Sequence, residues 1–148
     1  MCYHDKYVEI FKCAKNLDLI VVTHAGVDYG YKDQPVKCTP DTVIDVLRKV
    51  GEFKLVLAHF GGHCCFDEVY DKLAGKNVYF DTSYILKETP KDCFVKILEK
   101  HGVDKVLFAT DSPWSSMKKD VETLKSFLLG RENEDAIFYK NAKKLLGI

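Results

Sequence analysis

The chain has 148 residues, 22 of them basic and 22 acidic, and 47% of its residues are hydrophobic. This neutral balance excludes the basic surface with which proteins bind nucleic acids or anionic membranes, and the length suits one domain. No apolar stretch is long enough for a membrane span, and the first residues lack the basic and then apolar order of a secretory signal, so we expect a cytoplasmic protein.

Helix and strand patterns alternate along the chain. Residues 7–14 space their apolar side chains on one helix face, and a strand pattern follows at 19–23. Thr39 and Pro40 open a helix that Gly51 ends. The later elements are a strand at 54–58, a helix at 67–74, a strand at 77–81, a helix at 91–101, a strand at 105–110, and helices at 116–129 and 135–146 with a break at 130–133. Four strands alternating with helices, without a low-complexity linker, predict a single α/β domain over residues 1–148 with a parallel sheet.

Three polar residues stand where an apolar run ends and a Gly or Pro turn begins. These are His24 in VVTHAG, His59 in LAHFGG and Asp111 in LFATDSPW. Because the carboxyl ends of parallel strands open onto one face, we expect the three side chains to converge there. Two imidazoles and a carboxylate favour a metal site or acid–base chemistry. Any one of them alone is better explained as a hydrogen-bonded structural residue, but the joint pattern favours a site.

Three further residues are candidates for contact with a substrate. Asp81, in the DTSY stretch after the third strand, lines the mouth of the site or caps a turn. Phe60 and Trp114 form pocket walls or pack at the rim of the fold. The loops at 29–35 and 85–90 are expected to set specificity, since specificity in such folds resides in loops.

The other histidines and the cysteines receive structural interpretations. His63, Cys64 and Cys65 are adjacent and cannot all point at one ion, so they predict a helix start with buried thiols. His101 precedes Gly102 at a predicted helix end and fits a cap that complements the helix dipole. The six cysteines have irregular spacing and no C-x-x-C pair, which is typical of reduced thiols.

The motifs together resemble a known family. THAG, LAHFGG, VYFDTSY, LFATDSPW and the closing NAKKLLGI occur in the order seen in the amidohydrolase superfamily. The chain is most similar to the amidohydrolase-related branch, which includes aminocarboxymuconate-semialdehyde decarboxylase and related hydrolases. The resemblance covers nearly the whole chain but only the second half of the family's (β/α)₈ barrel, since a full barrel takes about 250 residues. It implies an α/β fold, the parallel (β/α) half of a TIM-type barrel, with four strands and flanking helices.

The resemblance also implies roles for the three converging residues. His24 matches a metal-binding histidine, and His59 matches a histidine that polarises the substrate carbonyl, transfers a proton or, in binuclear members, binds metal. Asp111 matches a catalytic carboxylate that contacts the metal and takes a proton from its bound water. The cofactor implied is a divalent metal such as zinc, and the reaction is hydrolysis of a C–N or ester bond in a small-molecule substrate. Non-oxidative decarboxylation on the same scaffold is the alternative.

One family feature is missing. The first strand of the family barrel carries a His-x-His pair, and no such pair occurs here; Cys2-Tyr3-His4 follows no strand and is a poor substitute. An incomplete site favours two alternatives to an autonomous enzyme: an inactive fragment, or a subunit that completes a barrel with another chain. A half barrel leaves one sheet face and two edges uncovered, so we expect a homo-oligomer or a partner chain supplying the other half.

Overall fold

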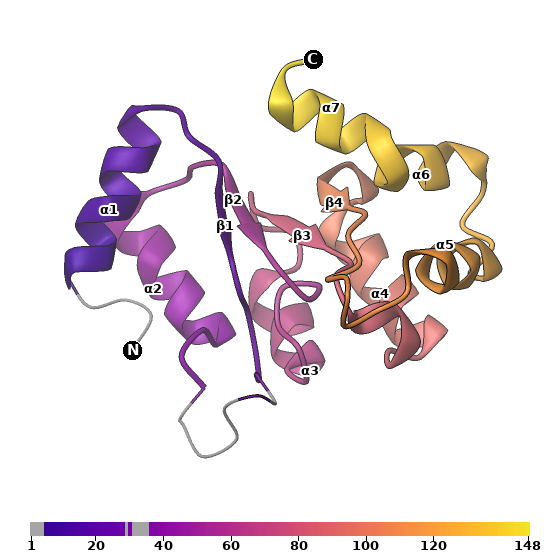
Figure 1. The fold of residues 1–148 in the computed structure, drawn as a ribbon. Helices are drawn as coiled ribbons and strands as arrows, with labels where there is room; N and C mark the ends of the chain where they lie inside the picture. Colours follow the sequence, from indigo (N-terminus) through magenta and orange to yellow (C-terminus); the bar gives the residue numbers. More distant parts are fainter. Residues whose placement is uncertain (1–4, 29, 31–35) are drawn as a thin grey trace.

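A computed structural model describes residues 5–28, 30 and 36–148. The core is a sheet of four parallel strands in the order β1-β2-β3-β4, which is also their order in the sequence (Figure 1). The strands are β1 (Val21–Thr23), β2 (Leu55–Leu57), β3 (Tyr79–Asp81) and β4 (Val106–Leu107). All four were predicted, with longer bounds. The Cys2-Tyr3-His4 stretch and most of the predicted loop at 29–35 lie outside the described residues.

Helical segments connect the strands and continue after the last one. They are α1 (Asp5–Asn16), α2 (Pro40–Val50), α3 (Phe66–Glu68) with the π-helical turn η2 (Val69–Leu73), the 3₁₀ turn η3 (Ile85–Lys87), α4 (Lys91–His101), the 3₁₀ turn η4 (Val103–Lys105), α5 (Met117–Ser126), and α6 (Arg131–Asp135) with the π-helical turn η5 (Ala136–Lys140) and α7 (Asn141–Leu146). None of the helices in the described ranges is both long and apolar enough to cross a membrane.

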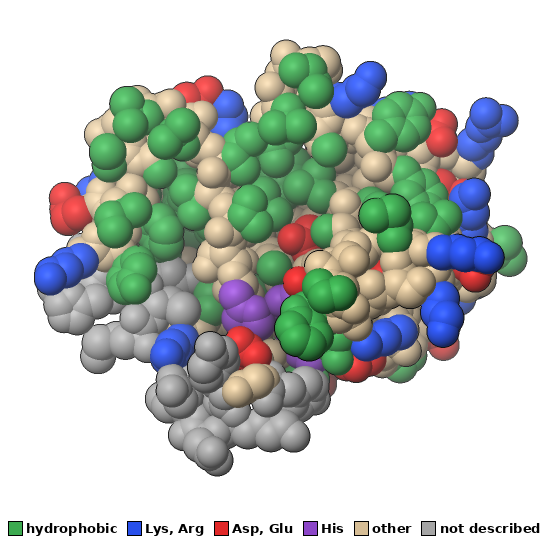
Figure 2. Space-filling view, in the orientation of Figure 1, with side chains coloured by type: hydrophobic (Ala, Val, Ile, Leu, Met, Phe, Trp, Pro, Cys, Tyr) green, Lys and Arg blue, Asp and Glu red, His purple; other side chains and the backbone are tan. Residues whose placement is uncertain are grey.

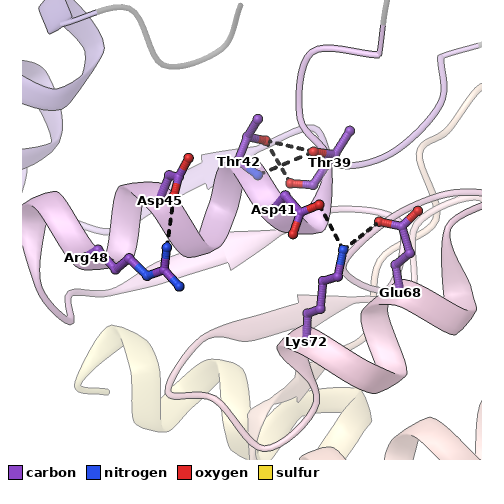
Figure 3. Close-up of polar contacts among 7 residues, drawn as sticks. All are labelled: Thr39, Asp41, Thr42, Asp45, Arg48, Glu68 and Lys72. Carbon is purple, nitrogen blue, oxygen red and sulfur yellow. Dashed lines mark hydrogen bonds and ion pairs between the residues drawn. The ribbon is translucent and has the colours of Figure 1, made fainter.

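Helix α2 begins and ends as its sequence predicts. The Thr39 hydroxyl accepts a hydrogen bond from the Thr42 backbone N–H at 3.3 Å, and Pro40 occupies the first turn, where no donor is needed. Gly51 has a φ of 78°, and its N–H donates to the Leu47 carbonyl. Figure 3 shows the cap formed by Thr39 and Thr42, together with Lys72.

A surface ion-pair cluster joins α2 to the segment that follows β2. The Lys72 ammonium lies 2.8 Å from an Asp41 oxygen and 3.4 Å from a Glu68 oxygen (Figure 3). All three side chains are well exposed, so their contribution to stability is small.

The two faces of the sheet have different surroundings. Strand register aligns Thr23, Leu57, Phe80 and Val106 across all four strands, and the last three are fully buried in the core beneath the helices. The next row on the opposite face contains Val22, Val56 and Tyr79. Val22 is 64% exposed, although it is a β-branched residue in the middle of a strand.

The uncovered face is visible in the figures. In the view of Figure 1 no helix lies in front of the strands. Figure 2, in the same orientation, shows hydrophobic side chains gathered over the middle of this face, with acidic and histidine side chains below them. Helices on one side and an open apolar face on the other are the arrangement of a section of a β/α barrel, in which the inner face is filled by the remaining strands.

The structure corrects three details of the sequence prediction. The last helical segment begins at Arg131, because Gly130 alone, at a φ of 85°, supplies the break predicted for 130–133. Residues 85–87 form a 3₁₀ turn whose Ile85 and Leu86 are buried in the core, so only Lys87, Glu88 and Pro90 of that predicted specificity loop are exposed.

The third correction concerns the edges of the sheet. The edge of β4 is not bare, because the C-terminal helical segment makes hydrogen bonds to it. The Phe108 N–H donates to the Ile137 carbonyl at 2.9 Å, and the Asn141 amide donates to the Val106 carbonyl at 2.8 Å. The edge of β1 has no neighbouring strand among the described residues.

Candidate functional site

A cavity of about 960 Å³ opens at the carboxyl ends of the four strands. Its lining includes five of the six predicted site residues, together with one histidine to which the sequence gave a structural role: His24, His59, Asp81, Asp111, Trp114 and His63. They come from the carboxyl end of β3 and from the segments that follow β1, β2 and β4. The convergence predicted from the strand ends is therefore present in the structure.

A smaller hollow of about 410 Å³ lies at the amino ends of the strands. Its charged groups are already partnered: Lys54 pairs with Asp18 at 2.6 Å, and Lys15 donates to the Val50 carbonyl at 2.9 Å. The chemistry-bearing residues therefore lie at the opposite end of the sheet.

His24 and His59 are in direct contact. The Nε2 atom of His59 lies 3.0 Å from the Nδ1 atom of His24, and the rings meet edge to face with centroids 4.7 Å apart. Partial burial, followed by the neighbouring His59, lowers the pKa of His24 below its usual value. His24 is therefore held in the neutral form, which is the form that offers a lone pair to a metal ion.

His59 is held from the side of β3. Its Nδ1 atom lies 3.0 Å from the Ser83 carbonyl oxygen and 3.1 Å from the Ser83 hydroxyl. Its backbone has a φ of 58°, in the left-handed region that a residue with a side chain rarely adopts. Sequence reasoning did not single out Ser83; its position two residues after Asp81, at the same strand end, is the clue that was available.

Asp111 and Trp114 form the side of the cavity that follows β4. Asp111 is exposed and has a φ of 57°, and its carbonyl accepts from the Trp114 N–H at 2.9 Å, which closes a turn. The Trp114 side chain is 72% exposed. A carboxylate and an open aromatic surface at one rim can contact a bound small molecule.

Phe60 is placed differently from the prediction. Its side chain is fully buried and stacks on Phe94 at 4.4 Å between centroids, so it belongs to the core and does not line the cavity. Burial of the whole ring in an aromatic cluster is the favourable outcome for an apolar side chain of this size.

His63 lines the cavity with both ring nitrogens engaged. Its Nδ1 atom lies 3.1 Å from the Val27 carbonyl and its Nε2 atom lies 3.1 Å from a Glu88 carboxylate oxygen. Neither nitrogen therefore points a lone pair at a metal. The expectation of buried thiols beside it is wrong for Cys64, which is exposed, and Cys65 is half-buried.

The side chains at this site are of the types that bind a divalent metal, but they are fewer than such an ion needs. Imidazole and carboxylate are ligands that zinc and similar ions accept, and two nitrogens bound to one tetrahedral zinc would be about 3.3 Å apart, close to the separation of His24 and His59. Within the described residues, however, no group of three or more His, Cys, Asp or Glu side chains is placed to hold an ion. A catalytic zinc usually has three protein ligands.

The fold and the cavity define one section of a TIM-type barrel with a site of two histidines and one aspartate at the carboxyl ends of its strands. The amidohydrolase family matches residues 3–148, and the chain belongs to that family. No curated protein matches the chain.

The fold of this chain is similar to part of several solved structures. An uncharacterised TIM-barrel protein from Bordetella bronchiseptica superimposes with a TM-score of 0.76 at 18% identity, over 99% of this chain and 52% of its own. An amidohydrolase from Burkholderia multivorans with bound zinc gives 0.71 at 15% identity, over 98% of this chain and 58% of its own. A dihydroxybenzoic acid decarboxylase from a Polaromonas species, with bound manganese and the inhibitor 2-nitroresorcinol, gives a TM-score of 0.68 at 14% identity, over 99% of this chain and 55% of its own. The chain spans about half the length of these structures.

Proposed function

We propose that this chain supplies one part of the active site of a metal-dependent amidohydrolase that cleaves a C–N or ester bond in a small molecule. The observation that carries the proposal is the 3.0 Å contact between the rings of His24 and His59 in a cavity that Asp111 shares. The binding of zinc and manganese by two structures of the same fold supports a divalent ion, and the nitrogen-rich donor set favours zinc.

In this proposal the chain's own residues divide the work. His24 and Asp111 hold the ion, which when bound would activate a water molecule and polarise the substrate. Asp111 is exposed to the cavity and free to accept a proton from the attacking water and pass it to the leaving group. His59 presents its Nε2 atom to the reacting group, and Trp114 offers a flat apolar surface to the substrate.

We propose further that a complementary half barrel of four parallel strands covers the open face of the sheet. Val22 is apolar and 64% exposed on this face, and the matched TIM-barrel structures are about twice as long as this chain. The complementary half would add the ligands that the described residues lack. The cysteine spacing is typical of reduced thiols, and we place the assembled protein in the cytoplasm.

The test is a chimera in which residues 1–148 replace the matching segment of the zinc-bound Burkholderia multivorans amidohydrolase. We expect zinc-dependent hydrolysis of members of a panel of amides, esters and lactones, and a loss of about 100-fold or more in Asp111→Asn. Asp28→Asn is the matched control, because Asp28 also lines the cavity and is exposed, and it should retain most of the rate.

Two results would contradict the hydrolase assignment. The first is a folded, zinc-loaded chimera in which Asp111→Asn and Asp28→Asn have the same rate. The second is release of carbon dioxide from aromatic carboxylates without hydrolysis of any amide, ester or lactone. That outcome would favour the decarboxylase alternative, which the likeness to the Polaromonas decarboxylase supports.

A further inference from the structure

A buried carboxylate at the end of β3 accepts hydrogen bonds from three donors on a single oxygen. Asp81 Oδ1 accepts from the Ser83 hydroxyl at 2.5 Å, from the Ser83 N–H at 3.0 Å and from the His59 N–H at 3.2 Å. Asp81 and Ser83 are 7% and 6% exposed. Charge-assisted hydrogen bonds of this kind in a buried setting are among the strongest that side chains make, so the Asp81–Ser83 pair forms a rigid unit.

This unit determines which nitrogen of His59 carries the proton. A carbonyl oxygen only accepts hydrogen bonds, so the Ser83 carbonyl at 3.0 Å requires a proton on His59 Nδ1. The Ser83 hydroxyl gives its own hydrogen to Asp81, which leaves its lone pairs to face the same Nδ1–H at 3.1 Å. The Gly26 carbonyl, 3.3 Å from His24 Nε2, by the same rule requires a proton on that nitrogen of His24. When both rings are neutral, His59 Nε2 and His24 Nδ1 therefore both carry lone pairs, which they offer to a cation or to a donor group of the substrate.

The same unit holds a strained turn. His59 and Phe60 both have left-handed backbones, with φ values of 58° and 56°, and neither is glycine. The His59 N–H is within reach of both Asp81 Oδ1 and the Ser83 hydroxyl, each at 3.2 Å, and the Phe60 N–H donates to the Asp81 carbonyl at 2.7 Å. Strained backbone persists where surrounding contacts hold it, and here those contacts come from Asp81 and Ser83.

We propose that Asp81 and Ser83 are positioning residues for His59. Ser83 fixes the Nδ1–H tautomer, and Asp81 orients the Ser83 hydroxyl and the backbone of His59. Asp81 then serves the site without contacting substrate, in contrast to the substrate contact that the sequence suggested. The importance of the tautomer to the reaction rests on the function proposed above, but the tautomer itself is a property of the free chain.

The experiment is ¹⁵N nuclear magnetic resonance of the metal-free chain with labelled histidine side chains, which reports the tautomer of each neutral ring. We expect His59 to be protonated on Nδ1 in the wild type. Ser83→Ala keeps the backbone carbonyl and loses only the hydroxyl acceptor, which is worth about 1 kcal/mol, so the share of the Nε2–H tautomer should rise from roughly a tenth or less to about a third. Ser83→Thr, which keeps the hydroxyl, should restore the wild-type value.

Thr89→Ala is the matched control. Thr89 is a buried residue whose hydroxyl has no hydrogen-bond partner among the described residues, so its loss should leave the His59 tautomer unchanged. The proposal is overturned if wild-type His59 is protonated on Nε2, or if Ser83→Ala leaves its tautomer populations at their wild-type values. Should Ser83→Ala fail to fold, the wild-type and Ser83→Thr spectra still decide the assignment.

A second readout separates this proposal from the function. His59 contacts the proposed ligand His24, and removing a group that supports a metal site typically weakens metal binding by about 10-fold to 100-fold, so Ser83→Ala should weaken zinc binding to that extent. A confirmed tautomer with unchanged zinc binding would leave the positioning role standing and count against His59 as a support of the metal site. A wrong tautomer would overturn the positioning role alone.

Discussion

His101 is the most deeply buried of the histidines that the structure describes. It is 4% exposed, its ring stacks on Phe80 at 3.8 Å between centroids, and its Nδ1 atom accepts from the Gly75 N–H at 3.3 Å. Burial, followed by nearby Lys105, lowers its pKa to about 4. At neutral pH the ring is uncharged, so the expected role as a charged cap of the α4 dipole is wrong, and the residue acts as a buried aromatic.

This histidine should make the protein less stable in acid. The unfolded chain takes up the proton near pH 6.5, whereas the folded protein does so only near pH 4, so the unfolded state binds more protons between these values. The free energy of unfolding should therefore fall by about 3 kcal/mol as the pH is lowered from 6.5 to 4. Urea unfolding of the wild type and His101→Phe at pH 7 and pH 4.5 measures the effect. The variant should show the smaller pH dependence, and an equal dependence in both proteins would contradict the explanation.

At the scale of single residues, the sequence predicted which side chains at strand ends line one cavity, because the ends of the strands are recognisable in the sequence. An apolar run that stops at a polar residue before a Gly or Pro turn placed His24, His59 and Asp111 at one cavity. It could not predict Ser83 or the core position of Phe60, because both depend on how the chain turns after β2 and on contacts with distant segments. The left-handed backbone of His59 could not be predicted either, because histidine is not a residue type that usually adopts this conformation.

Among the elements, the turn after β1 is held by backbone hydrogen bonds and by a close backbone contact. Gly26 donates to the Cys38 carbonyl at 2.8 Å, and the His63 N–H donates to the Ala25 carbonyl at 3.0 Å. A Cβ atom on Gly26 would lie 2.1 Å from the backbone nitrogen of His63, and the φ of Gly26 is 88°. This close backbone approach brings the segment carrying His24 against the segment carrying His63, so both sides of the cavity depend on it.

Replacement of Gly26 should therefore be far more harmful than replacement of an equally left-handed glycine elsewhere. Gly26→Ala should lower the free energy of unfolding by about 3 kcal/mol or more, since steric overlap adds to backbone strain. Gly130→Ala, at a φ of 85° with open space around it, should lower it by about 1 kcal/mol. Urea unfolding of the two variants provides the measurement. Equal losses would show that the contact at Gly26 relaxes without cost.

The elements themselves were largely predictable. Caps such as Thr39 and breaks such as Gly51 and Gly102 are local, and their helices begin and end where the sequence indicates. The two π-helical turns and the hydrogen bonds between the C-terminal segment and β4 were not predicted, because they depend on tertiary contacts and not on local propensity.

For the whole molecule, the dominant feature is the apolar face that no helix covers (Figure 2). Val22 at the middle of β1 is 64% exposed, and β1 lies at the end of the sheet. An exposed strand edge beside an apolar face is a site at which chains associate. We therefore expect the isolated chain to self-associate through this surface.

Light scattering at micromolar concentration tests the role of this surface. Val22→Lys should shift the chain toward monomer, because a charge on the open face opposes burial against a second copy. Ile148→Lys replaces an equally apolar residue that is 81% exposed at the carboxyl terminus, and it should leave the association unchanged. A monodisperse wild-type monomer with cooperative unfolding, or an equal effect of both substitutions, would contradict the assignment of the open face.

Zinc titration of the metal-free chain by calorimetry tests the central claim most directly, namely that His24, His59 and Asp111 form part of a metal site. With two imidazoles in contact and one carboxylate on the same cavity, we expect one zinc per chain at micromolar affinity or weaker, lost in His24→Ala and in Asp111→Asn and retained in Asp28→Asn. Binding that survives in His24→Ala and Asp111→Asn would contradict the site. Nanomolar binding abolished by His24→Ala would show that the chain holds a complete site and needs no complementary half.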